Sequence, residues 1–147
     1  GRLPSAQRAQ VARLTAQSAM VFQSHNLFPH FTALRNVTEG PIVVQKRPAA
    51  EVEPEARDLL ARVGLEPGRF AQRYPHELSG GQVQRISILR ALTVRPRYLV
   101  ADEITAPLDP ASQARLWHAL RDIASARPSN RRRLSAARSI FMLRSLV

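Results

Sequence analysis

The feature of the sequence that most constrains the fold is the continuous apolar run YLVA at 98–101, which Asp102 and Glu103 follow at once. An apolar run of this length without alternating polar residues is typical of a strand buried on both faces of a parallel sheet. Parallel sheets occur almost only in α/β proteins, where helices cover them. The run therefore predicts an α/β fold with two carboxylates at the carboxyl end of a central strand, where such sheets bind ligands.

Helix and strand signals surround this run. Thr32 and Ser79 are predicted N-caps, because their hydroxyl oxygens can accept hydrogen bonds from the first helical turn. Gly64 is a predicted C-cap, and Gly40-Pro41 is predicted to end the second helix. The predicted elements are helices over 6–16, 32–40, 51–63, 79–94 and 110–126, and strands over 18–23 and 97–103.

A glycine pair, Gly80 and Gly81, follows Ser79 at the predicted start of a helix. Backbone N–H groups at a helix N-terminus can bind a phosphate, and glycine lets another molecule approach the backbone closely. A conventional phosphate loop reads G-x-x-x-x-G-K-[ST], and its lysine reaches the β- and γ-phosphates. The only lysine is Lys46, so these 147 residues contain no such loop.

The two acids after the apolar run have two interpretations. An Asp at position 102 can hold Mg²⁺, because this ion prefers oxygen ligands and keeps part of its hydration shell. A Glu at position 103 can orient or deprotonate a water that attacks a phosphoryl group. In the alternative interpretation, the pair only caps the turn that follows the strand.

The formal net charge of +11 lies at the two ends of the chain. Residues 1–38 carry four arginines and residues 127–147 carry six, both without an acid, whereas 39–126 are nearly balanced. Aromatic residues do not alternate with basic ones, so the pattern argues against nucleic-acid binding as the main function. No apolar run reaches the roughly 18 residues of a membrane span, so direct membrane insertion is not expected. The arginine-rich residues 127–147 are predicted to be poorly ordered.

Four segments, in the same order, resemble motifs of the ATP-binding-cassette (ABC) ATPases. LSGGQ at 78–82 resembles the signature motif, and RYLVADE at 97–103 resembles the Walker B strand. APLD at 106–109 is similar to the D-loop, and VFQ places Gln23 at the Q-loop. The resemblance covers about residues 4–126. It implies a partial P-loop NTPase domain of ABC type, with an α/β fold.

The resemblance also implies roles for individual residues. Glu103 is the expected catalytic residue, and Asp102 and Gln23 are the expected Mg²⁺ ligands. The signature loop is expected to contact ATP that is held by a partner subunit, which would explain a glycine pair without a lysine. The residues expected to bind the nucleotide are Gln23, Ser79, Gly80, Gly81, Gln82, Asp102 and Asp109.

The same resemblance predicts how the chain is organised. Residues 1–126 would form the partial ABC domain, in which 24–95 are mostly a helical subdomain and 97–126 hold Walker B, the D-loop and a helix. No Walker A is present, and no histidine follows His118 to act as the switch histidine. The chain is therefore expected to be truncated at both ends, and the isolated chain is expected to be inactive.

The expected function is that of the ATP-binding subunit of a bacterial import system, which couples ATP hydrolysis to solute uptake. The motifs leave polar amino acids and peptides or nickel open as substrate classes. A second ATP-binding subunit and transmembrane permease subunits are the expected partners, at the cytoplasmic face of the cell membrane. Two alternatives remain: a non-catalytic fragment or interaction protein that keeps the fold, and an ABC ATPase of DNA repair. The absence of cysteines and of heptad repeats disfavours the second.

Overall fold

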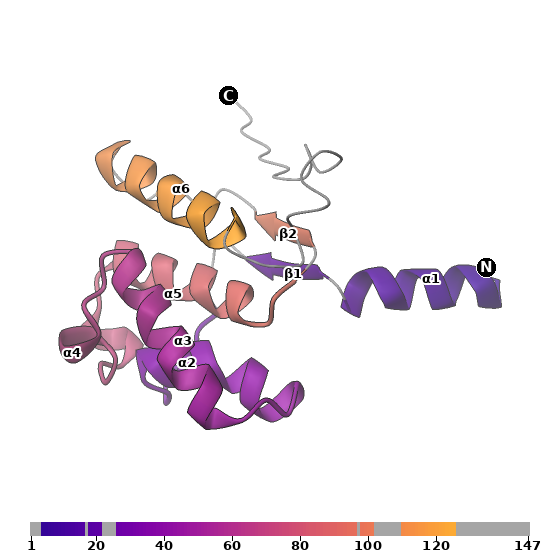
Figure 1. Cartoon of the computed structure of the whole chain (residues 1–147), viewed down its shortest axis with the longest axis horizontal. Coiled ribbons are helices and arrows are strands. Elements are labelled where there is room, and N and C mark those ends of the chain that lie inside the picture. The colour runs from indigo at the N-terminus through magenta and orange to yellow at the C-terminus, as the bar shows by residue number, and fades with distance from the viewer. Residues whose placement is uncertain (1–3, 17, 22–25, 97, 102–109, 126–147) are drawn as a thin grey trace.

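A computed structural model describes residues 4–16, 18–21, 26–96, 98–101 and 110–125 (Figure 1). Gln23, Asp102, Glu103 and Asp109, together with the predicted tail at 127–147, lie outside the described residues. The elements in chain order are α1 (Ser5–Ala16), β1 (Ser18–Val21), α2 (Ala33–Glu39), a π-helical turn (Gly40–Val44), α3 (Ala49–Arg62), α4 (Pro67–Phe70), a 3₁₀ turn (Pro75–Glu77), α5 (Gly80–Thr93), β2 (Tyr98–Ala101) and α6 (Pro110–Ser125).

The two strands pair in parallel, as the apolar run predicts. Ser18 is opposite Tyr98, and Val21 is opposite Ala101, so both strands end at the same edge. A parallel pair needs a crossover connection, and here α2 to α5 form it. The long helical crossover therefore follows from the pairing of two strands that are far apart in the sequence.

Helix α5 is the centre of the described molecule. In Figure 1 it lies between the strands and the α2–α3 pair, while α1 projects away from the rest. Its apolar side chains are buried: Ile86, Ile88 and Leu89 have no exposed surface. Leu60 of α3 and Leu116 of α6 are also buried. The core is thus built around α5, because its side chains are buried on several faces.

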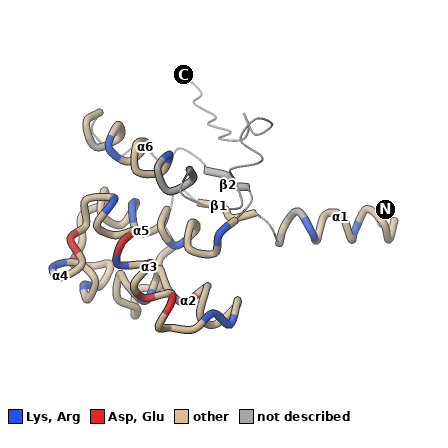
Figure 2. Tube along the Cα trace, viewed as in Figure 1, with Lys and Arg blue, Asp and Glu red and all other residues tan. Residues whose placement is uncertain are grey.

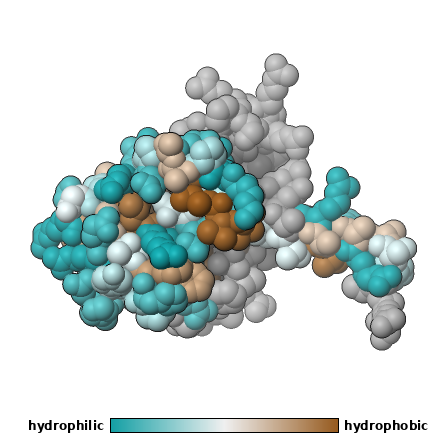
Figure 3. Space-filling model, turned by 90° about the horizontal axis from the view of Figure 1, so that it is seen from below, coloured by the Kyte–Doolittle hydropathy of each residue, from teal (hydrophilic) through white to brown (hydrophobic). Residues whose placement is uncertain are grey.

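The surface is mostly hydrophilic, with apolar side chains scattered over it. Figure 2 shows acidic residues on the α2–α5 part and none on α1. Figure 3 shows an apolar patch on an otherwise largely hydrophilic face. The described residues contain no helix that is both long and apolar enough to cross a bilayer. The large apolar side chains that are exposed are Val11, Phe28, Val43, Val44 and Tyr74.

Two predicted caps are confirmed by their hydrogen bonds. Thr32 Oγ1 accepts from the backbone N–H of Arg35 at 3.2 Å, so Thr32 caps α2. Gly64 has a φ of +78° after α3, and Leu65 N–H donates to Leu60 O at 2.9 Å. A left-handed glycine with this bond across the helix end is a Schellman cap.

The prediction that Gly40-Pro41 ends the second helix is confirmed for the α-helix, since α2 ends at Glu39 with Gly40 as its C-cap, but the π-helical turn that follows was not predicted. Gly40 is helical, with φ −59° and ψ −55°, and the chain continues as the π-helical turn. Pro41 has no N–H for the carbonyl of Val37, four residues earlier. The hydroxyl of Thr93 donates to this carbonyl at 2.8 Å. A distant residue thus supplies the hydrogen bond that proline removes, and the helical path continues.

Candidate functional site

The turn before α5 fixes where the signature segment begins. Tyr74 N–H donates to Glu77 Oε2 at 2.7 Å, and Glu77 N–H donates to Tyr74 O at 2.9 Å. Leu78, half-buried, then packs against the core. The chain therefore enters Ser79 from an anchored position, although Ser79 itself is exposed.

Ser79 and Gln82 form a capping box at the start of α5. Ser79 Oγ accepts from the N–H of Gln82 at 3.3 Å, and Gln82 Oε1 accepts from the N–H of Ser79 at 2.9 Å. This confirms Ser79 as the N-cap. The first amides of a helix, here those of Gly80 and Gly81, have no acceptor within the helix. The positive end of the helix dipole also lies here, so the arrangement suits an anion.

Gly80 has space around it on the protein surface. A Cβ built on Gly80 meets nothing within 4 Å among the described residues, and Gly80 is exposed. Its φ is not in the left-handed region, so the backbone does not require glycine either. The described residues therefore give no reason for glycine at position 80. Close approach of a second molecule to the backbone would be a reason for glycine at this position.

The remaining predicted site residues follow the paired strands directly. Val21 and Ala101 are register partners at the carboxyl edge of the sheet. Gln23 comes two residues after the first strand, and Asp102 and Glu103 come immediately after the second. These three residues lie outside the described part of the chain, so their grouping into one site stays a prediction.

A predicted cluster for Mg²⁺ therefore depends on residues outside the described part. Within the described residues, no group of three or more His, Asp or Glu side chains could hold a metal ion. The oxygen donors predicted for the ion are a carboxylate and an amide, which are ligand types that Mg²⁺ accepts.

Two positioning residues were not predicted from the sequence. Asn36 has no exposed surface, and its amide group donates to the carbonyls of Phe28, Phe31 and Thr32 at 3.1 Å each. It thereby organises the loop a few residues after Gln23. Asparagine is disfavoured inside helices, so its presence within the predicted helix 32–40 was a signal that its side chain bonds to nearby backbone groups.

Arg90 is the second such residue, and it links α5 to the segment after β1. Its guanidinium Nη1 donates to the carbonyl of Asn26 at 2.7 Å. Burial lowers the pKa of Arg90, but a guanidinium remains charged at neutral pH. Nothing in the spacing of the two residues, 64 positions apart, predicts this contact.

A parallel strand pair joined by a helical crossover, with a capped glycine pair at the start of α5, is the arrangement expected of an ATP-binding cassette. The family profile described as ABC transporter matches residues 3–106. The chain belongs to this family, as the motifs predicted.

Curated relatives share the sequence closely over most of this chain. The L-cystine import ATP-binding protein TcyC of Bacillus subtilis (strain 168) is 46% identical over 118 residues, which are 80% of this chain and 47% of that protein. The glutamine transport ATP-binding protein GlnQ of Escherichia coli (strain K12) is 49% identical over 113 residues, 76% of this chain and 46% of that protein. The chain thus spans about half the length of the curated relatives it matches.

The fold is also similar to solved structures. The dimeric structure of MJ0796, a bacterial ABC transporter cassette, aligns with a TM-score of 0.67 and 34% identity. The alignment covers 82% of this chain and 52% of that one. A dimeric post-hydrolysis state of the same cassette, bound to ADP and Pi, aligns with a TM-score of 0.66. These similarities confirm the partial ABC-type fold.

Proposed function

We propose that this chain is part of the ATP-binding subunit of an amino-acid importer and that it couples ATP hydrolysis to uptake. The names of its relatives support the amino-acid class over peptides or nickel, since they include cystine and glutamine transport proteins. They also disfavour the DNA-repair alternative. A second ATP-binding subunit and a membrane permease are the proposed partners, at the cytoplasmic face of the membrane.

The observation that carries this proposal is the open start of α5. Ser79 and the N–H groups of Gly80 and Gly81 would contact the γ-phosphate of ATP on a second subunit. The absence of neighbours around Gly80 leaves room for that approach. The dimeric state of the structurally similar cassette supports a site shared between two subunits. Gln82 would keep Ser79 in place through the capping box.

The acids after β2 would form the other half of a site. Asp102 and Gln23 would supply oxygen ligands for Mg²⁺, whose charge, when the ion is bound, offsets that of the phosphates. Glu103 would accept a proton from the attacking water, and Asp109 would contact the nucleotide region across the interface. The pairing of Val21 with Ala101 supports this grouping, because it brings the two segments to one sheet edge. In this account 24–95 form the helical subdomain, and 97–126 complete the domain.

The test uses a completed chimera, in which ABC-type Walker A and switch segments are joined to residues 1–126. Glu103→Gln should abolish steady-state hydrolysis and retain ATP binding, because the amide is nearly isosteric but cannot accept a proton. ATPase rate and nucleotide affinity are both measured. An unchanged rate would exclude Glu103 as the base. The 147-residue chain alone should stay far below a typical turnover of about 10 s⁻¹; ordinary turnover by it would contradict the need for Walker A.

A further inference from the structure

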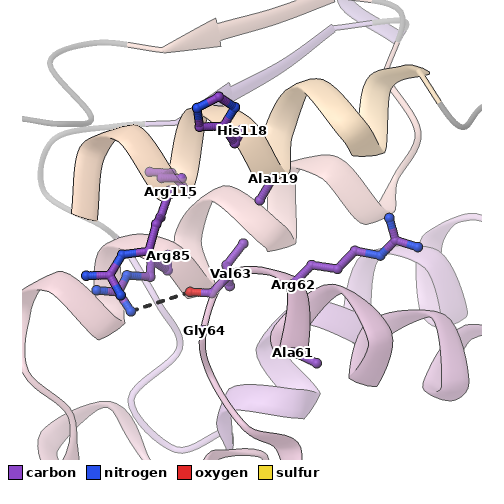
Figure 4. A pocket seen from close by; sticks show the side chains of 9 residues that line it. Ala61, Arg62, Val63, Gly64, Arg85, Arg115, His118 and Ala119 are labelled. Carbon is purple, nitrogen blue, oxygen red and sulfur yellow. Dashed lines mark hydrogen bonds between the residues drawn. The ribbon is translucent and has the colours of Figure 1, made fainter. Parts of the chain in front are cut away.

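A cavity of about 420 Å³ lies between the end of α3, the middle of α5 and α6 (Figure 4). The residue of α5 that lines it, Arg85, follows the LSGGQ segment on the same helix. Its volume is within the range of small-molecule sites, roughly 300–1,000 Å³. The described residues that line it are Ala61, Arg62, Val63, Gly64, Arg85, Arg115, Leu116, His118 and Ala119.

The described lining of this cavity is basic and contains no acid. One of its three arginines is already paired: Arg62 Nε contacts Asp58 Oδ2 at 2.7 Å. Figure 4 shows Arg62 on the opposite side from Arg85 and Arg115. Figure 4 also shows His118 pointing away from these two arginines. The positive charge that faces the cavity therefore comes from Arg85 and Arg115.

Arg85 and Arg115 come from different helices and lie on one side of the cavity (Figure 4). Neither forms an ion pair with a described residue. Arg85 Nη1 donates to Val63 O at 3.4 Å, and Arg115 Nε donates to Ala111 O at 3.4 Å, both long hydrogen bonds. A guanidinium has five N–H donors, so the described residues leave most of the donor capacity of this pair unused.

The wall beside the two arginines is apolar. Val63, Leu116 and Ala119 are each less than a tenth exposed. An apolar wall lowers the local dielectric, so the repulsion between neighbouring cations rises and so does their attraction for an anion. Gly64 lies next to Arg85: a Cβ built on it would be 3.8 Å from Arg85 Nη1, an ordinary van der Waals contact, so glycine is needed here for its φ of +78° and not to keep the cavity open.

We propose that this cavity binds a small oxyanion, a phosphate or carboxylate group, between Arg85 and Arg115. The planar guanidinium fork matches the paired oxygens of both groups. A small molecule that carries one such group fits the volume. The described lining includes none of the residues proposed above to bind the nucleotide, and the proposal does not depend on that function.

The experiment titrates the full 147-residue chain with inorganic phosphate and, separately, with succinate, at constant ionic strength. Amide chemical shifts by NMR locate binding, and the amides of Val63, Gly64 and Ala119 should move together. Whichever probe binds more tightly identifies the preferred oxyanion. Chloride at the same ionic strength should leave these signals in place.

Two matched variants decide whether binding is specific. Arg115→Gln removes an exposed helical arginine whose described hydrogen bond is within its own helix, and it should weaken probe binding by about tenfold or more. Arg57→Gln removes the same charge from an exposed position on α3 outside the cavity and should change binding less than about twofold. Equal losses in both variants, or no movement of the three amides with either probe, would overturn the proposal. Arg85→Lys is a second test, because lysine keeps the positive charge but lacks the planar guanidinium; it should also weaken binding of the probe.

Discussion

The first residues of α5 are held by their immediate neighbours in sequence, whereas its last residues are held by side chains from distant segments. At the start, Ser79 exchanges two hydrogen bonds with Gln82 in the capping box, and its carbonyl accepts from the N–H of Val83, so these bonds span three or four residues. At the end, Gln45 Nε2 donates to Val94 O at 2.8 Å, and Arg47 Nη1 donates to Thr93 O at 3.2 Å. These donors are 49 and 46 residues away.

An ionic cluster adds to the hold on the C-terminal end. Arg95, with a φ of +52° just after the helix, contacts Glu55 at 3.0 Å and Glu51 at 3.5 Å. Arg47 contacts the same two acids. Cations and amide donors at this end also suit the negative pole of the helix dipole.

The difference between the two ends of α5 suggests that the C-terminal end contributes to stability and the N-terminal end to binding. The C-terminal end is integrated into the fold, so changes there should lower stability. The N-terminal end is exposed and held only locally, so changes there should alter binding while the fold persists. The predictions that follow, from the largest effect on stability to the smallest, test this separation.

Thr93→Val should lower the free energy of unfolding by about 1–3 kcal/mol, because it leaves the buried carbonyl of Val37 without the hydroxyl donor. Urea unfolding of both proteins measures the change. Thr15→Val is the matched control: its hydroxyl also bonds to a carbonyl, that of Val11, but on an exposed helix. The control should stay within about 0.5 kcal/mol of the parent. Equal losses of unfolding free energy at both positions would show that the buried hydrogen bond of Thr93 contributes no more to stability than the exposed one of Thr15.

Glu55→Gln should lower stability by no more than about 1 kcal/mol at pH 7, since the ion pairs are partly exposed. Burial alone would raise the pKa of Glu55, but hydrogen bonds from Arg47 and Arg95 outweigh it and lower the pKa. The contribution is therefore complete above the unfolded value of about 4.3 and is lost as pH falls through the lower folded pKa.

The measurement compares urea midpoints for the parent and Glu55→Gln at neutral pH and near pH 3. The difference should shrink at the acidic pH. Glu53→Gln, an exposed change on the same helix, is the matched control and should lower the urea midpoint at neutral pH by less than Glu55→Gln does. A difference that grows on acidification would mean that the sign of the Glu55 shift is wrong.

Gly80→Ala should leave stability unchanged or raise it by up to about 1 kcal/mol, because the new methyl group has space and the unfolded chain loses entropy. Gly64→Ala is the contrasting change, since its φ of +78° strains any L side chain and should cost about 1–2 kcal/mol. Thermal unfolding of both variants gives the comparison. Marked destabilisation by Gly80→Ala would show that the start of α5 is packed after all.

Local sequence signals predicted both ends of α5 to within a residue, but they did not predict the contacts that hold its C-terminal end. Ser79 and Thr32 could be assigned as caps because a capping bond joins residues three apart. The end depends on Thr93 and Val37, which are 56 residues apart, and no local pattern contains that distance. For the same reason no local pattern predicted the π-helical turn that follows α2, where Thr93 bonds to the carbonyl of Val37. The roles of Glu103 and Asp102 came from the family resemblance and stay predictions, since both lie outside the described residues.

The central claim is that the open end of α5 serves a nucleotide on another subunit. It is tested most directly by Gly81→Asp in the completed chimera, mixed with a second chimera whose Walker A lysine is replaced. Gly81→Asp alone should keep monomer ATP affinity and lose ATP-driven dimerisation and hydrolysis, because a carboxylate would face the γ-phosphate and repel it by several kcal/mol. The mixture should regain part of the ATPase activity through one complete composite site. Loss of monomer ATP affinity in Gly81→Asp, with no recovery in the mixture, would contradict the account.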